Sequence, residues 1–375
     1  MSEAWIADRM RHIEASGIRK AFDLSKKMVD PINLSIGLPD FDVPDSIKEA
    51  AISAIREGQN AYTLTLGLPE LRTHIQQHVD TEFGHADRPV IVTAGTSGGL
   101  LLALCCTVNP GDEVILFDPY FVMYNNLVAL AGGKSVLVDT YPDFGIHLDR
   151  VAAAVTPRTK CILLNSPNNP TGAVASADEV AALARFCQER NILLISDEVY
   201  KTFCYNGPFA SPASFNDQVL VVDGFSKSYG MTGWRLGYAH GPSQLIQEMA
   251  KLQQFSYVCA PAPLQKGVVD AMNLDLTAQA AAYRAKRDQV VQALSGLYDL
   301  GHPGGAFYAF PKVPAGYASA TEFAAAAIPH NLLIIPGNVF SKRDTHFRIS
   351  YAVNDRTLER GLDVLKQLAA GPKKA

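Results

Sequence analysis

This sequence of 375 residues has no long apolar run and few clustered basic residues, and its first residues lack the pattern of a signal peptide. No stretch approaches the ~18 consecutive apolar residues that a membrane span needs. The N-terminus carries charges where a signal peptide needs an apolar run. Lys and Arg do not cluster beyond Lys373-Lys374, and the formal net charge is −4, which is a poor match to nucleic acid or an anionic membrane. We therefore expect a cytoplasmic protein that binds neither.

Cys-x-x-Cys motifs are missing as well, although the sequence has six cysteines. They lie mostly in apolar stretches, which predicts reduced, buried thiols. Glu70, His74 and His78 have the helical spacing that can bring two imidazoles onto one metal. Nothing near them in the sequence completes a site, so we expect an exposed helix face and no metal.

The composition, with 48% hydrophobic and 19% charged residues, is that of a globular protein with a sizeable core. From Pro89 onward, short apolar runs alternate with helical patterns. The predicted strands are 90–93, 113–117, 135–138, 161–164, 192–195, 219–222 and 234–239. Unalternating strands rich in Val, Ile and Leu, joined by helical crossovers, indicate a mainly parallel sheet covered on both faces. The sequence therefore predicts an α/β fold with functional side chains just past the strand ends.

The last third of the sequence differs from this pattern. A long helical stretch over 264–297 precedes three further strand candidates, at 301–310, 331–336 and 346–351. With the N-terminal segment, these elements predict a smaller α+β domain. We expect a large domain over 46–285 and a small domain made of 1–45 plus 286–375.

The stretch 220–238 contains the most informative chemistry. Ser226 and Lys227 follow a strand, and Arg235 lies eight residues past the lysine. Most lysines are solvated surface residues, but an amine held at a strand end can form a Schiff base with a carbonyl cofactor. Ser226 and Arg235 could then bind a phosphate, the serine by a hydrogen bond and the arginine by a bidentate fork.

Other strand ends also carry polar groups. A glycine-rich run begins a helix at Gly95, and free amides at a helix N-terminus favour an anion. Asp197 ends an apolar strand, where a buried carboxylate needs a partner because an unpaired charge is costly to bury. Asp223 is a competing carboxylate, which we interpret as a turn residue. Arg348 lies inside an apolar strand, and its planar guanidinium suits a substrate carboxylate.

The run from Gly224 to Gly237, with Ser226-Lys227, Met231 and Gly233-Trp234-Arg235-Leu236-Gly237, resembles the pyridoxal-phosphate lysine motif of class I/II aminotransferases. Further matches extend from the region of Gly37 to Arg348, so the resemblance covers nearly the whole chain. It implies the pyridoxal-phosphate-dependent transferase fold type I, with a seven-stranded sheet between helices, and pyridoxal 5'-phosphate as the cofactor.

The resemblance also implies roles for individual residues. Lys227 would bind the cofactor and act in catalysis, Asp197 would pair with the ring nitrogen, and Arg348 would grip the substrate α-carboxylate. The phosphate would be bound by Gly95, Thr96, Ser97, Ser226 and Arg235. Phe121 would stack on the ring face, and Asn169 and Tyr200 would contact the 3-oxygen. Gly37 and Asn169 would contact the substrate. Tyr62 would reach the phosphate of a neighbouring subunit, which implies a homodimer.

Three activities follow from these patterns. We expect an aminotransferase that moves an amino group between an L-amino acid and a 2-oxo acid in ping-pong fashion. The donor is expected to be neutral or aromatic, because the phosphate loop offers no second cation for a distal carboxylate. A β-lyase on the same fold is the alternative. A serine hydrolase is a remote alternative, because residues 95–99 read Gly-x-Ser-x-Gly. Its catalytic triad would be Ser97, either Asp197 or Asp223, and one of His302, His330 and His346.

Overall fold

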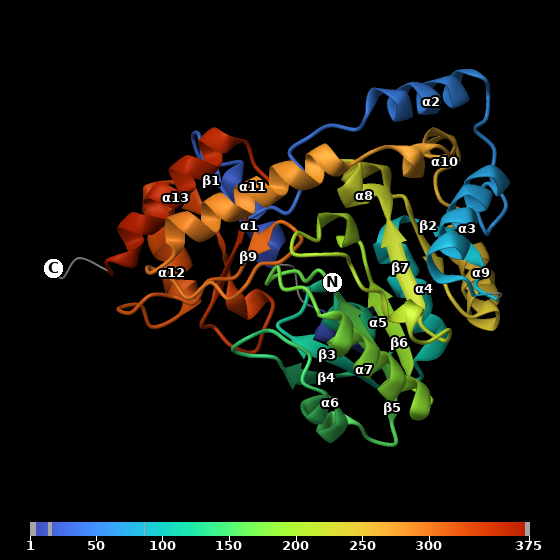
Figure 1. The fold of residues 1–375 in the computed structure, drawn as a ribbon, viewed down its shortest axis with the longest axis horizontal. Coiled ribbons are helices and arrows are strands. Elements are labelled where there is room, and N and C mark those ends of the chain that lie inside the picture. Colours follow the sequence, from blue (N-terminus) through green and yellow to red (C-terminus); the bar gives the residue numbers. More distant parts are fainter. Residues whose placement is uncertain (1–4, 14–16, 86, 372–375) are drawn as a thin grey trace.

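The computed structural model describes residues 5–13, 17–85 and 87–371 (Figure 1). Its largest layer is a seven-stranded sheet with the strand order β2-β8-β7-β6-β5-β3-β4. The strands are β2 (Val90–Thr93), β3 (Glu113–Asp118), β4 (Lys134–Asp139), β5 (Thr159–Asn165), β6 (Leu193–Asp197), β7 (Leu220–Gly224) and β8 (Gly237–His240). β8 is antiparallel to both of its neighbours, β2 and β7, and the other strand pairs are parallel. The predicted mainly parallel seven-stranded sheet is confirmed.

Helices cover both faces of this sheet, because successive residues of each strand point to opposite sides. In β3, Val114 and Leu116 pack in one core cluster with α4 (Gly95–Thr107), α5 (Met123–Leu130) and α9 (Ser243–Ser256). Ile115 and Phe117 pack in another cluster with α6 (Leu148–Ala154) and α7 (Ala177–Glu189). A third cluster joins α2 (Asp45–Arg56), α3 (Pro69–Phe83) and α10 (Ala262–Gly267) to the β2 and β8 edge. Burial on both faces explains why the strands are apolar throughout.

Two predictions around the last strands of the sheet are wrong. The strand expected at 234–239 begins only at Gly237, because Thr232–Trp234 form a 3-10 helix and Arg235 has a positive φ of 58°. Asp223, interpreted as a turn residue, belongs to β7 and is buried. It is stabilised there by the Tyr238 hydroxyl at 2.7 Å and by Lys201 Nζ at 3.0 Å.

The second body of the molecule lies beside the carboxyl ends of the parallel strands. It contains a two-stranded parallel sheet of β1 (Ile32–Asn33) with β10 (Leu332–Leu333) and a three-stranded antiparallel sheet of β11 (Ile335–Pro336), β12 (Phe347–Ser350) and β9 (Tyr308–Ala309). Helices α11 (Thr277–Leu294), α12 (Ala320–Ala327) and α13 (Asp355–Ala369) lie around these sheets (Figure 1). The stretch predicted as helical over 264–297 is divided between α10, the 3-10 turn Ala271–Asn273 and α11.

The N-terminal segment returns to this second body. After the 3-10 turn Asp8–His12 and α1 (Gly17–Ser25), β1 pairs with β10, and Ser350 N donates to Leu34 O at 2.8 Å. The expected division into 46–285 and 1–45 plus 286–375 stays a prediction, and α11 runs across position 285 as one helix.

The cysteines depart in part from expectation. All six are free, but only Cys161 and Cys187 are buried as predicted; Cys106, Cys204 and Cys259 are partly exposed, and Cys105 on α4 is exposed. In the described part of the chain, every helix is too short or too polar to cross a membrane.

Candidate active site

A cavity of about 250 Å³ lies where the strand ends of the large sheet meet the second body. It collects most of the side chains that the sequence singles out. These lining residues are Gly37, Thr96, Ser97, Phe121, Asn169, Asp197, Tyr200, Ser226, Lys227, Arg235 and Arg348. Of the other two candidates, Gly95 adjoins the cavity at the start of α4, and Tyr62 lies outside it with 81% of its surface exposed.

Lys227 lies on α8 (Phe225–Ser228), directly after β7. Its Nζ donates a hydrogen bond to the carbonyl oxygen of Gly37 over 2.8 Å. Burial, together with the nearby Arg348 and Arg235 guanidinium groups, lowers the pKa of Lys227 to about 8. In the described structure the amine forms no ion pair with a carboxylate. A lysine in this environment is partly neutral near physiological pH and can react as a nucleophile.

Asp197 ends β6 and is buried. Its Oδ2 accepts a hydrogen bond from the Tyr124 hydroxyl at 2.7 Å, and its Oδ1 accepts a longer one from Val199 N at 3.3 Å. Burial raises the pKa of Asp197 to about 6, so the carboxylate is mostly ionised at neutral pH. Within the residues described, no cation pairs with it. A buried, ionised and unpaired carboxylate fits a cationic group on a ligand.

Arg348 is buried in β12. Its Nη1 donates to Asn169 Oδ1 at 2.9 Å and its Nη2 donates to Ser35 O at 2.6 Å. The guanidinium carbon lies 4.7 Å from the ring centroids of both Tyr308 and Phe340. Its buried Nε has no hydrogen-bond partner in the part of the chain that the structure describes. An arginine that lines the cavity and retains an unpaired N–H fits a carboxylate ligand.

The end of the cavity at α4 has donors for a second anion, distinct from the carboxylate that fits Arg348. Helix α4 begins at Gly95 with a φ of 71°, and a Cβ there would lie 2.5 Å from Arg235 Nη2, so only glycine fits. Arg235 Nη2 lies 3.5 Å from Ser97 Oγ, and Arg235 Nη1 donates to Thr232 O at 2.9 Å. The α4 amides, Ser226 and this guanidinium together match the requirements of a phosphate.

Three residues of the site were not found from the sequence. Asn165 donates through Nδ2 to the main-chain oxygen of Asp197 at 3.1 Å and accepts from Asn169 N at 2.9 Å. The Tyr308 hydroxyl lies 2.8 Å from the Tyr200 hydroxyl. Tyr124 is the third. Asn165 directly follows the strand predicted at 161–164, which is a usable signal. Nothing in the sequence distinguishes either tyrosine from core aromatics.

The geometry gives no support to a hydrolase. Among the described lining residues of the cavity there is no histidine, and His346 stacks on Phe310 at 5.3 Å instead.

The metal alternative also lacks support. Glu70 pairs with Lys266, and His74 Nδ1 lies 2.7 Å from Val269 O. Over the described residues, no group of three His, Cys, Asp or Glu side chains could hold a metal ion.

Comparison with known proteins agrees with this site. The family model "Aminotransferase class I and II" matches residues 29–365. The aromatic-amino-acid aminotransferase 2 of Thermococcus litoralis is 33% identical over 97% of this chain and 98% of its own length. The aspartate/prephenate aminotransferase of Thermus thermophilus is 36% identical over 92% of both chains.

Solved structures extend the comparison to the fold. The aspartate aminotransferase of Thermus thermophilus, solved with maleate, superimposes with a TM-score of 0.90 at 34% identity and covers 97% of this chain and 99% of its own. The fold is therefore the pyridoxal-phosphate-dependent transferase fold type I. The protein is an enzyme whose cofactor is pyridoxal phosphate, and the amine, the carboxylate and the amide and guanidinium donors of the cavity fit that cofactor. The chain belongs to the class I and II aminotransferases.

Proposed function

We propose that this cavity binds pyridoxal phosphate through Lys227, and that the chain moves an amino group between an L-amino acid and a 2-oxo acid in two successive half-reactions. One observation supports this most strongly. A single cavity contains an amine with a pKa of about 8 and, among the described residues, a buried carboxylate without an ion-pair partner and a buried arginine with an unpaired N–H. These groups match the cofactor's aldehyde, its ring nitrogen and the substrate's α-carboxylate in turn.

When bound, pyridoxal phosphate supplies an aldehyde that joins covalently to amines and a ring that takes up the electrons left on a substrate's α-carbon. Asp197 holds a proton on the ring nitrogen, because its buried carboxylate is ionised at neutral pH. Lys227 would hold the cofactor through Nζ. When that nitrogen is free, its neutral amine would accept the α-proton of the substrate as a general base, for which a pKa near the working pH is well suited.

Arg348 and Asn169 orient the reacting groups. A guanidinium can only donate, so its bond from Nη1 fixes Oδ1 of Asn169 on the arginine side and leaves Nδ2 free to donate to the cofactor's 3-oxygen. Tyr200 is assigned to the same oxygen and Gly37 to the substrate. The unpaired Nε–H of Arg348 supports binding of the α-carboxylate.

The phosphate is assigned to the start of α4. Gly95, Thr96 and Ser97 provide helix N-terminal amides, and Arg235 with Ser226 provides side-chain donors. Phe121 lines the same cavity and is assigned to the ring face. It packs edge-on against Tyr124, with ring centroids 5.6 Å apart and an interplanar angle of 82°.

A homodimer is part of this proposal. Tyr62 lies outside the cavity of its own chain and is 81% exposed, and Leu64 and Phe255 are exposed at 62% and 83%. Large apolar side chains at such exposure favour an interface. A second copy that covers them would let Tyr62 reach the phosphate in the neighbouring site.

The lining of the cavity also favours a class of substrate. Among the described lining residues, the cations are Lys227, Arg235 and Arg348, and each already has a role. The remaining wall includes the apolar side chains Ile18, Ile36, Leu38, Leu100 and Met123. We therefore assign donors with aromatic or other uncharged side chains in preference to aspartate. The relative named for aromatic amino acids supports this choice.

The test is a half-reaction with the purified holoenzyme, single L-amino acids and no oxo acid. Loss of the visible cofactor band with stoichiometric oxo acid and pyridoxamine phosphate is the expected result, with phenylalanine, tyrosine or leucine faster than aspartate. Faster reaction with aspartate would refute the substrate class alone. Accumulation of ammonia and pyruvate with an unchanged band would instead identify a β-lyase and refute the proposal.

A further inference from the structure

Tyr124 contacts the carboxylate that faces the cofactor site, although nothing in the sequence singles it out. Its side chain is buried, with 2% of its surface exposed, and its hydroxyl lies 2.7 Å from Asp197 Oδ2. An ionised carboxylate can only accept, so the tyrosine donates. Hydrogen bonds to an ionised acceptor are short and strong.

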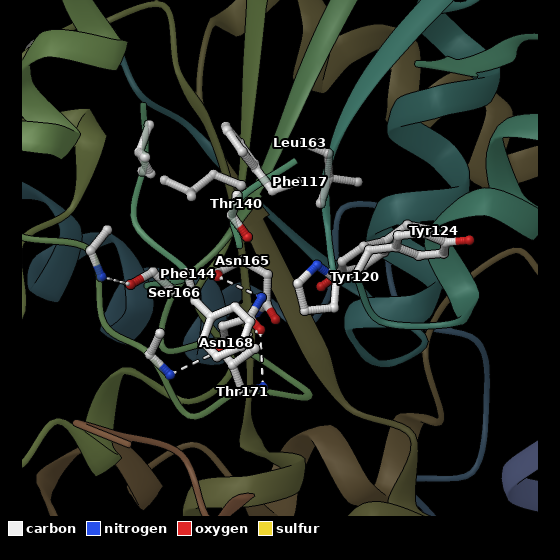
Figure 2. Close-up of a pocket in the computed structure, with 15 residues that line it drawn as sticks. Phe117, Tyr120, Tyr124, Thr140, Phe144, Leu163, Asn165, Ser166, Asn168 and Thr171 are labelled. Carbon is white, nitrogen blue, oxygen red and sulfur yellow. Dashed lines mark hydrogen bonds between the residues drawn. The ribbon is translucent and has the colours of Figure 1, made fainter. Parts of the chain in front are cut away.

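Tyr124 also forms part of a wall between two cavities. A second cavity of about 40 Å³ lies behind the carboxyl ends of β3 and β5 (Figure 2). Tyr124 and Asn165 line both this cavity and the large one. Figure 2 shows the Tyr124 hydroxyl directed away from the other labelled side chains of the small cavity. The two wall residues hold Asp197 at two points, Tyr124 at Oδ2 and Asn165 at the main-chain oxygen.

We propose that Tyr124 is a positioning residue for the cofactor: its hydroxyl fixes Asp197 Oδ2, keeps this carboxylate ionised and leaves Oδ1 to the protonated ring nitrogen. The inference rests on the proposed function, because it assigns Asp197 to that nitrogen. Oδ1 retains acceptor capacity, since its only described contact is Val199 N at 3.3 Å.

The electrostatic surroundings of Asp197 agree with this role. Burial raises the pKa of Asp197, and the hydrogen bond from Tyr124 is the largest influence that lowers it. The other groups that act on it are Asp223 on β7, which raises the pKa, Lys227 on α8, which lowers it, and the main-chain N–H of Val199. Tyr200 is a further buried hydroxyl nearby. Without the Tyr124 hydroxyl, Asp197 would therefore take up a proton at a higher pH.

The test is the substitution Tyr124→Phe, which keeps the ring that packs on Phe121 and removes only the hydroxyl. The dissociation constant of pyridoxamine phosphate for the cofactor-free protein would be measured from pH 5.5 to 9. This probe cannot bond covalently to Lys227. At pH 7 we expect binding to weaken on the order of ten-fold. Since Asp197 must be ionised, affinity falls as the pH drops through its pKa, and that midpoint should lie about one unit higher in the variant.

Two controls separate positioning from packing. Tyr298→Phe removes another buried hydroxyl, which donates to Leu365 O at 2.7 Å in the second body, and should leave binding unchanged. A pyridoxamine phosphate analogue with carbon in place of the ring nitrogen should bind equally to wild type and Tyr124→Phe.

Each contrary result has a distinct meaning. Unchanged binding of pyridoxamine phosphate by Tyr124→Phe would overturn the inference. An equal loss at every pH, or an equal loss for the carbon analogue, would overturn it in favour of a structural role. Wild-type protein that binds no pyridoxamine phosphate would overturn the proposed function and this inference with it.

Discussion

Arg348 donates a hydrogen bond from Nη1 to Oδ1 of Asn169 over 2.9 Å. The bond joins β12 of the second body to the loop after β5 of the large sheet. One residue is assigned to the substrate carboxylate and the other to the cofactor's 3-oxygen. Removal of the Asn169 side chain should therefore affect both the substrate and the cofactor.

Asn169→Ala should weaken both substrate and cofactor binding. Removal of Oδ1 leaves a second guanidinium N–H of Arg348 without a partner, and removal of Nδ2 takes a donor from the cofactor. A hydrogen bond that involves a charged group contributes about 1.5–3 kcal/mol, so each effect should be roughly ten-fold or more. KM for the amino acid and the dissociation constant of pyridoxal phosphate measure the two effects. Arg348→Lys, which keeps the charge but loses the fork, should raise KM and leave cofactor affinity nearly unchanged.

Lys227→Ala should abolish covalent attachment of the cofactor and nearly all turnover. Borohydride reduction of the holoenzyme followed by mass spectrometry of the peptides should find the phosphopyridoxyl group on Lys227 in the wild type and on no lysine in the variant. Lys266→Ala is the matched control, since Lys266 forms its ion pair with Glu70 away from the cavity. Substantial turnover by Lys227→Ala would contradict the assignment.

The amine of Lys227 should react at lower pH than other lysines. Its pKa is lowered from 10.5 to about 8, so in the cofactor-free protein it becomes neutral as the pH rises through 8. Competitive acetylation should therefore give half-maximal reactivity near pH 8, against roughly 10.4 for solvated lysines. Arg235→Ala removes a positive neighbour and should shift the midpoint upward. A midpoint near 10 in the wild type would show that burial and the two arginines do not act as described.

Gly37→Ala should destabilise the cofactor-free protein. An added Cβ would lie 1.9 Å from the Tyr308 hydroxyl oxygen and 2.7 Å from its ring. Relief of such a clash by backbone movement costs about 1–3 kcal/mol and would also displace the carbonyl that accepts from Lys227. Urea unfolding measures the loss. Gly233→Ala is the control, because a Cβ there meets nothing within 4 Å, and equal stability of the two variants would contradict the steric argument.

Much of the fold and of the site could be predicted because the signals are local. The strands predicted at 90–93, 113–117 and 161–164 are mostly apolar without alternation, which is typical of a sheet covered on both faces. Polar residues directly after such runs, such as Asp197, are then brought to one edge. The resemblance in the lysine motif added the identity of the cofactor.

The errors and omissions have a common physical cause. Asp223 looked like a turn residue because its partners, Tyr238 and Lys201, come from other elements and cannot be seen in its own surroundings. Tyr124 was missed for the same reason, since Asp197 lies far along the sequence. A buried polar side chain is stabilised by its hydrogen-bond or ion-pair partner, and when that partner comes from a distant element only the tertiary structure identifies it.

The pairing of β1 with β10 has a consequence for how the enzyme is made. Ile32 aligns with Leu332, at opposite ends of the chain, and this contact anchors the segment that carries Gly37. Contacts of such long range form late, because a large loop must close before they contribute. During synthesis, Asp197 and Lys227 leave the ribosome well before β10 and β12 do, because they come earlier in the sequence. Arg348, which is assigned to the substrate, is therefore the last of the assigned site residues to leave the ribosome, and the site is complete only after β12 has been synthesised.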